Sequence, residues 1–169
     1  MMKVGTKFPE YPDFHLVQFN YATAKGEIDD PVMADFVAAL DRINTLADGS
    51  PGFVWRLQTD TGHSSDIRPW PDHPLRLVTY SIWEEIEPLV KYVYSSEHGE
   101  FMRRRGEWFE RPAPGEPYLV LWWVEKGIKP SVEEAVAKLA FLAKNGNTPE
   151  AFGFRSLYSP YGELIQTGT

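Results

Sequence analysis

Cysteine is absent from this sequence of 169 residues. Without thiols the chain can form no disulfide bond, thiolate nucleophile, iron–sulfur cluster or cysteine zinc site. Positive charge is also scarce, because 17 Lys and Arg residues stand against 24 Asp and Glu residues and give a formal charge of -7. This balance weighs against a broad nucleic-acid or anionic-membrane surface. We therefore expect no nucleic acid and no membrane among its partners.

Long hydrophobic runs and phosphate-binding motifs are missing as well. The first fourteen residues contain two lysines, two prolines and no apolar run, so no signal peptide or transmembrane helix is predicted there and a cytoplasmic protein is expected. The sequence contains neither G-x-G-x-x-G nor G-x-S-x-G nor an H-x-x-x-H pair. Asp60, His63 and Asp66 fit a solvated loop as well as a metal site, so no metal is predicted.

Apolar residues alternate with turn residues in a regular order. Short apolar and aromatic runs predict strands at 14–21, 53–59, 75–83 and 118–124. Helical spacing predicts helices over about 29–48, 84–109 and 131–144, with a polar loop at 60–74. The predicted fold class is α+β, a ferredoxin-like βαββαβ arrangement with a four-stranded antiparallel sheet and an extra C-terminal helix. We expect a single domain over 1–169, with its core in about 14–125 and a C-terminal extension over 126–169.

The predicted helices carry recognisable start signals and apolar stripes. Asp29, Asp30 and Pro31 are typical of a helix start, and Ser131 with Glu134 forms a capping box before the last helix. Gly99 and Gly106 are expected to bend or interrupt the long middle helix. The stripe of the first helix consists of Met33, Phe36, Val37, Leu40, Ile43 and Leu46.

Strands three and four are apolar on both faces, which is unusual for a sheet covered on one side. In the run 118–124, for example, Val120 and Trp122 share one face while Leu121 and Trp123 share the other. A large exposed apolar face is rare in a soluble monomer, so a second subunit's sheet is the simplest cover. The sequence therefore predicts a homodimer that closes a barrel between two sheets. In a monomer the C-terminal helix or tail must cover that face instead.

The segment 92–110 is the densest in side chains that carry chemistry. On a continuous helix, His98 and Arg105 would lie two turns apart on nearly the same face, beside Tyr94 and Phe101. His98 is then a candidate acid–base group or ligand, and Arg105 a candidate anchor for an anionic substrate group. The structural alternative is a histidine that bonds a carbonyl and arginines paired with nearby glutamates. The tryptophans fit an aromatic pocket or simple core packing.

Several runs together resemble a known family. They are YSIWEEIEPLVKYVYSSEHGEFMRRRGEWFE, PYLVLWWVEKGIKPSVEEAVAKLAFL and TPEAFGF, with HLVQFNYA and GFVWRLQT upstream. Over about 14–154 the chain resembles the domain of unknown function 3291 family, which is grouped with the dimeric α+β barrels. Relatives in that group include antibiotic biosynthesis monooxygenases and haem-degrading monooxygenases. The resemblance implies a dimeric barrel but brings no established reaction.

The resemblance leaves two main functions open for a small-molecule-binding protein, beside a purely structural dimer. The first is a monooxygenase-like enzyme without a cofactor, in which His98 deprotonates an aromatic or enolic metabolite while Asn20 and Arg105 stabilise the oxyanion. The second is a non-catalytic carrier of haem or another ligand. Haem-degrading relatives combine an asparagine, matched by Asn20, with a tryptophan and a histidine where Tyr92 and Met102 stand, so His98 would have to ligate the iron. Expected substrate-binding residues are Trp55, Tyr92, Tyr94, Phe101, Trp108 and Trp123.

Overall fold

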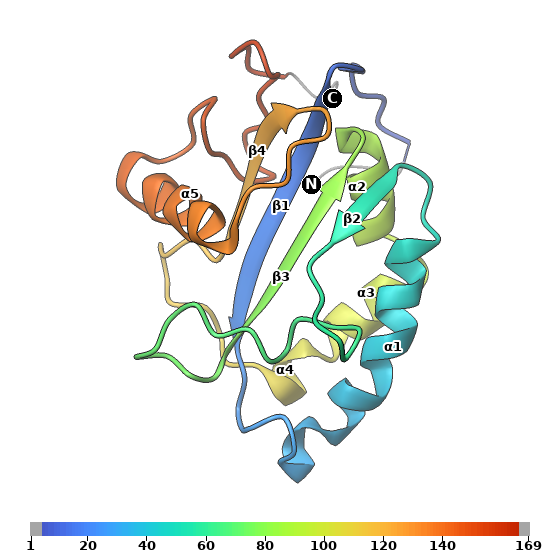
Figure 1. Cartoon of the computed structure of the whole chain (residues 1–169), viewed down its shortest axis with the longest axis vertical. Helices are drawn as coiled ribbons and strands as arrows, with labels where there is room; N and C mark the ends of the chain where they lie inside the picture. Colours follow the sequence, from blue (N-terminus) through green and yellow to red (C-terminus); the bar gives the residue numbers. More distant parts are fainter. Residues whose placement is uncertain (1–4, 166–169) are drawn as a thin grey trace.

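The computed structural model describes residues 5–165 and contains one four-stranded antiparallel sheet with helices on both faces (Figure 1). Its strand order is β2-β3-β1-β4, which is the ferredoxin-like order. The predicted α+β class is therefore confirmed. The second strand is shorter than predicted and ends at Arg56. The strands are β1 (Phe14–Thr23), β2 (Phe53–Arg56), β3 (Arg76–Trp83) and β4 (Leu119–Glu125).

The first helix begins where the sequence predicts. Asp30 caps a short 3-10 turn, η1 (Pro31–Met33), by accepting a hydrogen bond from the Val32 N–H at 3.0 Å, and α1 (Ala34–Asp48) follows directly. Val37 is an exception to the predicted stripe, because its side chain is 39% exposed. It lies about 100° around the helix from buried Phe36, at the edge of the apolar face.

The long middle helix is broken into three pieces, and the breaks are not at the predicted glycines. The pieces are α2 (Ile86–Val93), α3 (Ser96–Arg103) and α4 (Arg105–Trp108). Ser95 has an extended backbone, and its hydroxyl accepts a hydrogen bond from the His98 N–H at 3.3 Å, so it begins a new helix. Gly99 and Gly106 lie inside α3 and α4, where the prediction of a bend is wrong.

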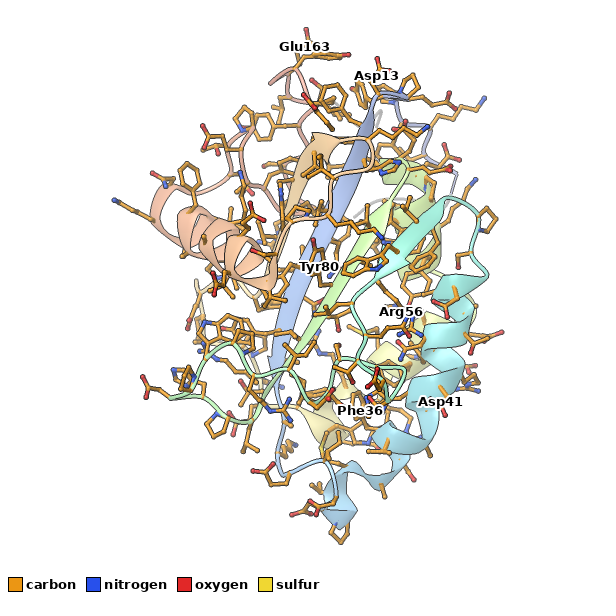
Figure 2. The ribbon with its side chains drawn as sticks, viewed as in Figure 1. Asp13, Phe36, Asp41, Arg56, Tyr80 and Glu163 are labelled. Atoms are coloured by element: carbon orange, nitrogen blue, oxygen red, sulfur yellow. The ribbon has the colours of Figure 1, made fainter. Side chains whose placement is uncertain are left out.

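Two apolar layers cover the sheet, one on each face. One face carries Leu16, Trp83 and Leu121, and the buried residues of α2 cover it. We call this face the helix face. On the opposite face, which carries Phe19 and Tyr80, the cover is α5 (Val132–Asn145). Figure 2 shows Tyr80 near the middle of that second face. The predicted capping box of α5 is present, with Ser131 and Glu134 bonded to each other's backbone N–H.

The chain itself supplies the cover that a second subunit was expected to supply. Leu139 of α5 and Trp70 of the loop 60–74 pack on the same apolar cluster, and the Trp70 ring lies 6.2 Å from the Phe19 ring. Figure 1 shows α5 and this loop on the same side of the sheet. Both faces are buried as predicted, but through the C-terminal helix, which was the expectation for a monomer. The homodimer stays a prediction, but the need to cover the second apolar face no longer supports it.

The segment after α5 returns to the sheet. Phe152 is fully buried and pairs with Leu121 on the outer edge of β4, through N–H to O contacts of 3.0 and 2.7 Å. The expected packing of this tail on the domain is confirmed as far as residue 165, and 166–169 lie outside the described residues. Among residues 5–165 no helix has the length and apolar character needed to cross a membrane.

Candidate functional site

His98 lies in the first turn of α3 and is half-buried. Its Nδ1 is 2.8 Å from the backbone carbonyl of Val93 at the end of α2. Because a carbonyl only accepts, Nδ1 carries the hydrogen, and Nε2 keeps its lone pair. No described residue donates a hydrogen bond to Nε2. Burial lowers the pKa of His98 from its usual 6.5, so the ring is neutral at pH 7 and able to accept a proton.

The His98 ring is the outer member of a stack of three rings. Its centroid lies 4.8 Å from that of Tyr92 on α2, and the Tyr92 ring lies 5.1 Å from that of Trp83 on β3. Burial raises the pKa of Tyr92 to about 12, so its hydroxyl stays protonated. The break at Ser95 turns α3 back on α2 and brings His98 against Tyr92. We call Trp83, Tyr92 and His98 the ring stack.

A chain of hydrogen bonds runs from the ring stack across the helix face of the sheet. The Trp83 indole N–H donates to the Ser81 hydroxyl at 2.9 Å, and that hydroxyl donates to Gln18 Oε1 at 2.8 Å. Gln18 Nε2 then donates to Asn20 Oδ1 at 2.5 Å. Asn20 is paired with Thr79 on β3. We call Gln18, Asn20, Thr79 and Ser81 the polar strip.

The polar strip is buried at one end and open at the other. Gln18 and Ser81 are buried, Asn20 is half-buried and Thr79 is exposed, although Thr79 lies in the middle of a strand. The helices therefore leave the sheet uncovered at Thr79. Asn20 Nδ2 has no hydrogen-bond acceptor within residues 5–165, so it is free to donate to a bound molecule.

Arg105 does not share a helix face with His98, contrary to the prediction. The chain breaks at Arg104, so Arg105 begins α4 and its guanidinium lies 5.7 Å above the Tyr118 ring. Tyr118 directly precedes Leu119, the β4 partner of Asn20. Arg105 thus lies beside Tyr118, just before β4, and no contact joins it to His98 among the described residues.

Two of the predicted pocket tryptophans lie elsewhere. Trp55 is on the face covered by α5, where its ring is 5.1 Å from that of Tyr80. Trp123 is on the helix face, but its indole N–H donates to the Tyr158 carbonyl at 2.7 Å and holds the C-terminal tail. The sheet separates Trp55 from His98, so the two cannot wall one pocket.

The remaining predicted residues divide between core and surface. Trp108 is buried with Phe36 and Phe101 in a cluster of its own, with ring centroids 5.1 to 5.8 Å apart. Tyr94 is 41% exposed at the end of α2. Of the predicted substrate-binding residues, the structure shows a ring contact to His98 only for Tyr92 among the described residues.

The prediction named only Asn20 of the polar strip, although the sequence carries a signal for the other three residues. Gln18 and Asn20 are two residues apart, so they lie on the same face of an otherwise apolar strand. Thr79 and Ser81 have the same spacing in a second apolar strand. Two polar pairs at the same spacing in otherwise apolar strands are expensive to bury without partners. That cost indicates a shared hydrogen-bond network, and the register of the two strands confirms that they face each other.

A cavity of about 450 Å³ lies away from this region, across the end of the sheet where β1 begins and β3 ends. None of the predicted site residues lines it. Within the described residues no group of three His, Asp or Glu side chains has an arrangement suited to a metal ion. The cavity is lined by Phe8, Pro9, Glu10, Pro12, Phe14, His15, Pro51, Glu84, Glu85, Glu87, Pro88, Lys91 and Lys126, and we call it the end cavity.

The chain belongs to the family described as Domain of unknown function (DUF3291), whose sequence pattern matches residues 15–167. This confirms the family resemblance seen in the sequence. A comparison with curated proteins finds no match.

Solved structures with a similar course of the chain come from several organisms. A conserved protein from Methanosarcina mazei Go1 is 10% identical, with a TM-score of 0.47, over 68% of this chain and 95% of its own. A proposed antibiotic biosynthesis monooxygenase from Nitrosomonas europaea is 16% identical, with a TM-score of 0.44, over 74% and 98%. SnoaB, a cofactor-independent oxygenase from Streptomyces nogalater, is 12% identical, with a TM-score of 0.44, over 68% and 95%.

Proposed function

We propose that this protein binds a small aromatic or enolic metabolite at the polar strip and that His98 removes the acidic proton of that metabolite. The observation that carries the proposal is the state of His98, a neutral imidazole whose Nε2 has no partner within residues 5–165. His98 is joined through the ring stack to polar groups that are open at Thr79. A base, an apolar wall and free donors are the parts that binding and deprotonation of such a molecule require.

The proposed reaction class is a monooxygenase-like oxidation without a cofactor, which is one of the functions that the family resemblance leaves open. His98 Nε2 takes the proton of an acidic C–H or O–H, and the Asn20 amide donates to the resulting oxyanion. The anion supplies electrons to oxygen, and the balanced reaction is R₂CH₂ + O₂ → R₂C=O + H₂O. The substrate carbon loses four electrons, and each of the two oxygen atoms of O₂ gains two. No external reductant is needed.

Oxygen uptake with phenols, quinols and cyclic 1,3-dicarbonyl compounds tests this function. His98→Gln should lower turnover by about 10² to 10⁴, which is the usual contribution of a positioned general base. His73→Gln is the matched control, because His73 lies exposed in the loop 60–74. Circular dichroism of each variant shows whether the fold is retained. Unchanged uptake in a folded His98→Gln variant would remove His98 from the mechanism.

One observation favours a second function, haem binding. A histidine that ligates a metal ion usually donates its other N–H to a carbonyl or carboxylate, and His98 donates to the Val93 carbonyl in this way. His98 Nε2 would then be the iron ligand, and the haem would supply redox or oxygen chemistry. Titration with haem should give a Soret band that His98→Ala loses and His73→Ala keeps. Absence of that band in the unaltered protein would refute this function.

A further inference from the structure

The end cavity is built from four separate segments that the fold brings together. The segment 8–14 crosses the start of α2, and the Tyr11 N–H donates to Glu85 Oε1 at 2.6 Å. On the other side, the Lys126 N–H donates to the Asp13 carbonyl at 3.0 Å and joins the turn after β4 to the start of β1. Figure 2 shows Asp13 at this end of the molecule. These two hydrogen bonds hold two of the cavity walls in place.

The third wall comes from the turn between α1 and β2. Gly52 has φ of +79°, and a Cβ on it would lie 2.4 Å from Pro88 Cγ. Only glycine lets this turn approach α2 so closely. The Gly52 carbonyl also accepts from the Glu84 N–H at 2.8 Å, which places Glu84 at the cavity.

Negative charge in the end cavity is not balanced by the protein. Glu87 is paired with Lys91 at 2.7 Å. Glu10, Glu84 and Glu85 form no salt bridge to any residue of the described part of the chain. Lys126 is a further cation at the wall, so four glutamates stand against two lysines.

Glu85 has a buried carboxylate oxygen that lacks a hydrogen-bond donor within residues 5–165. Its Oε1 accepts the hydrogen bond from Tyr11, but Oε2 is buried and has no hydrogen-bond partner within residues 5–165. A buried carboxylate oxygen without a donor is costly. Burial raises the pKa of Glu85, and the neighbouring Glu10 and Glu84 raise it further. A cation that donates to Oε2 would remove this cost.

His15 is a second buried polar group with unused hydrogen-bonding capacity. Its side chain is 6% exposed and lines the end cavity, and its ring has no hydrogen bond to any described residue. Lys126 and Glu84 are the charged groups that act on it. Burial lowers the pKa of His15, so the ring is neutral and does not balance the glutamates. It can still bond a polar group of a ligand.

We infer that the end cavity binds a small organic cation, a primary ammonium group carried on an apolar stem. The ammonium would donate to Glu85 Oε2 and to Glu84, because charge-assisted hydrogen bonds to carboxylates are strong. The rings and prolines at the wall would pack against the stem. A volume of about 450 Å³ accommodates such a molecule. An organic cation is favoured over a metal ion because the acidic residues described here lack the arrangement that a metal needs.

Benzylamine, benzyl alcohol and benzoate are suitable probes, since they share a ring and differ in charge. Calorimetric titration of the full chain should show millimolar or tighter binding of benzylamine and at least tenfold weaker binding of the other two. Glu85→Gln keeps an acceptor for Tyr11 but removes the charge, and it should weaken benzylamine binding at least tenfold. Glu133→Gln makes the same change of charge on the exposed side of α5 and should leave the affinity unchanged.

Amide NMR on the unaltered protein locates the site independently of any variant. Benzylamine should shift the amides of Tyr11, His15 and Lys126 and leave those of Asn20 and Thr79 in place. This pattern would stand even if His98 proved to have no catalytic role. Equal binding of all three probes, no binding of benzylamine, shifts confined to other surfaces, or equal loss in the two variants would each overturn the proposal. If the Glu85→Gln variant does not fold, the amide shifts of the unaltered protein still decide whether benzylamine binds in the end cavity.

Discussion

Replacing Ser81 by alanine tests the hydrogen-bond chain that ties β3 to β1. The Ser81 hydroxyl is buried and bonds on two sides, accepting from Trp83 Nε1 at 2.9 Å and donating to Gln18 Oε1 at 2.8 Å. Its loss leaves one buried donor and one buried acceptor without partners. Each such group costs about 1 to 3 kcal/mol, so we expect the free energy of unfolding to fall by about 2 to 6 kcal/mol.

Urea denaturation followed by far-UV circular dichroism measures this change through the transition midpoint at a constant slope. Thr79→Val is the matched control, because Thr79 is exposed two residues away on the same face of the same strand. It should change the free energy of unfolding by about 0.5 kcal/mol or less. A loss below about 0.5 kcal/mol for Ser81→Ala as well would refute a continuous chain from Trp83 to Asn20.

Two further predictions concern α5 and His98. Leu139→Ala should lower the free energy of unfolding by about 2 to 5 kcal/mol, because Leu139 is buried between α5 and the sheet; a loss under about 1 kcal/mol by the same titration would show that α5 does not cover this face. Because burial lowers the pKa of His98 in the folded chain, the unfolded chain binds its proton first as pH falls below 6.5, and stability is lost there. The stability advantage of the unaltered protein over His98→Gln should therefore shrink below pH 6.5, by at most about 1.4 kcal/mol per pH unit. Parallel pH profiles of the two proteins would contradict a half-buried, neutral histidine.

The element order could be predicted because each signal was local. The apolar run of β1, the Asp30 cap and the capping box at Ser131 each depend on residues within one turn or one strand. An interruption of the middle helix was predicted, but at Gly99 and Gly106, because glycine was taken as the signal for a break. The structure places the first break at Ser95, where α3 begins and packs on α2. A serine that can cap a new helix ends the old one more effectively than a glycine, which a helix interior tolerates.

The site was predicted in part. His98 was chosen from its residue type and Asn20 from the family resemblance, and the structure places both on the helix face, linked through the ring stack and the polar strip. Trp55 and Arg105 were placed by assuming a continuous helix and one shared pocket. The sheet face of Trp55 depends on the irregular pairing between Phe53 and Trp55 in β2, which no local pattern reveals.

Of the features of the fold, the segment that covers the second face of the sheet was the hardest to predict from the sequence. Apolar residues on both faces of β4 show that something must cover each face, but they do not say whether it belongs to the same chain. The amphipathic stripe of α5 could equally pack on its own sheet or on a partner. The geometry of the turn after β4 settles this, by returning α5 over Tyr80 and Trp122.

The protonation state of His98 is the most direct test of the central proposal. Long-range ¹H–¹⁵N NMR of the imidazole at pH 7 distinguishes the two neutral tautomers and the charged ring. We predict a neutral ring with the hydrogen on Nδ1, held by the Val93 carbonyl, and a pKa below 6.5. A charged ring at pH 7, or a neutral ring with the hydrogen on Nε2, would contradict the assignment of His98 as the base.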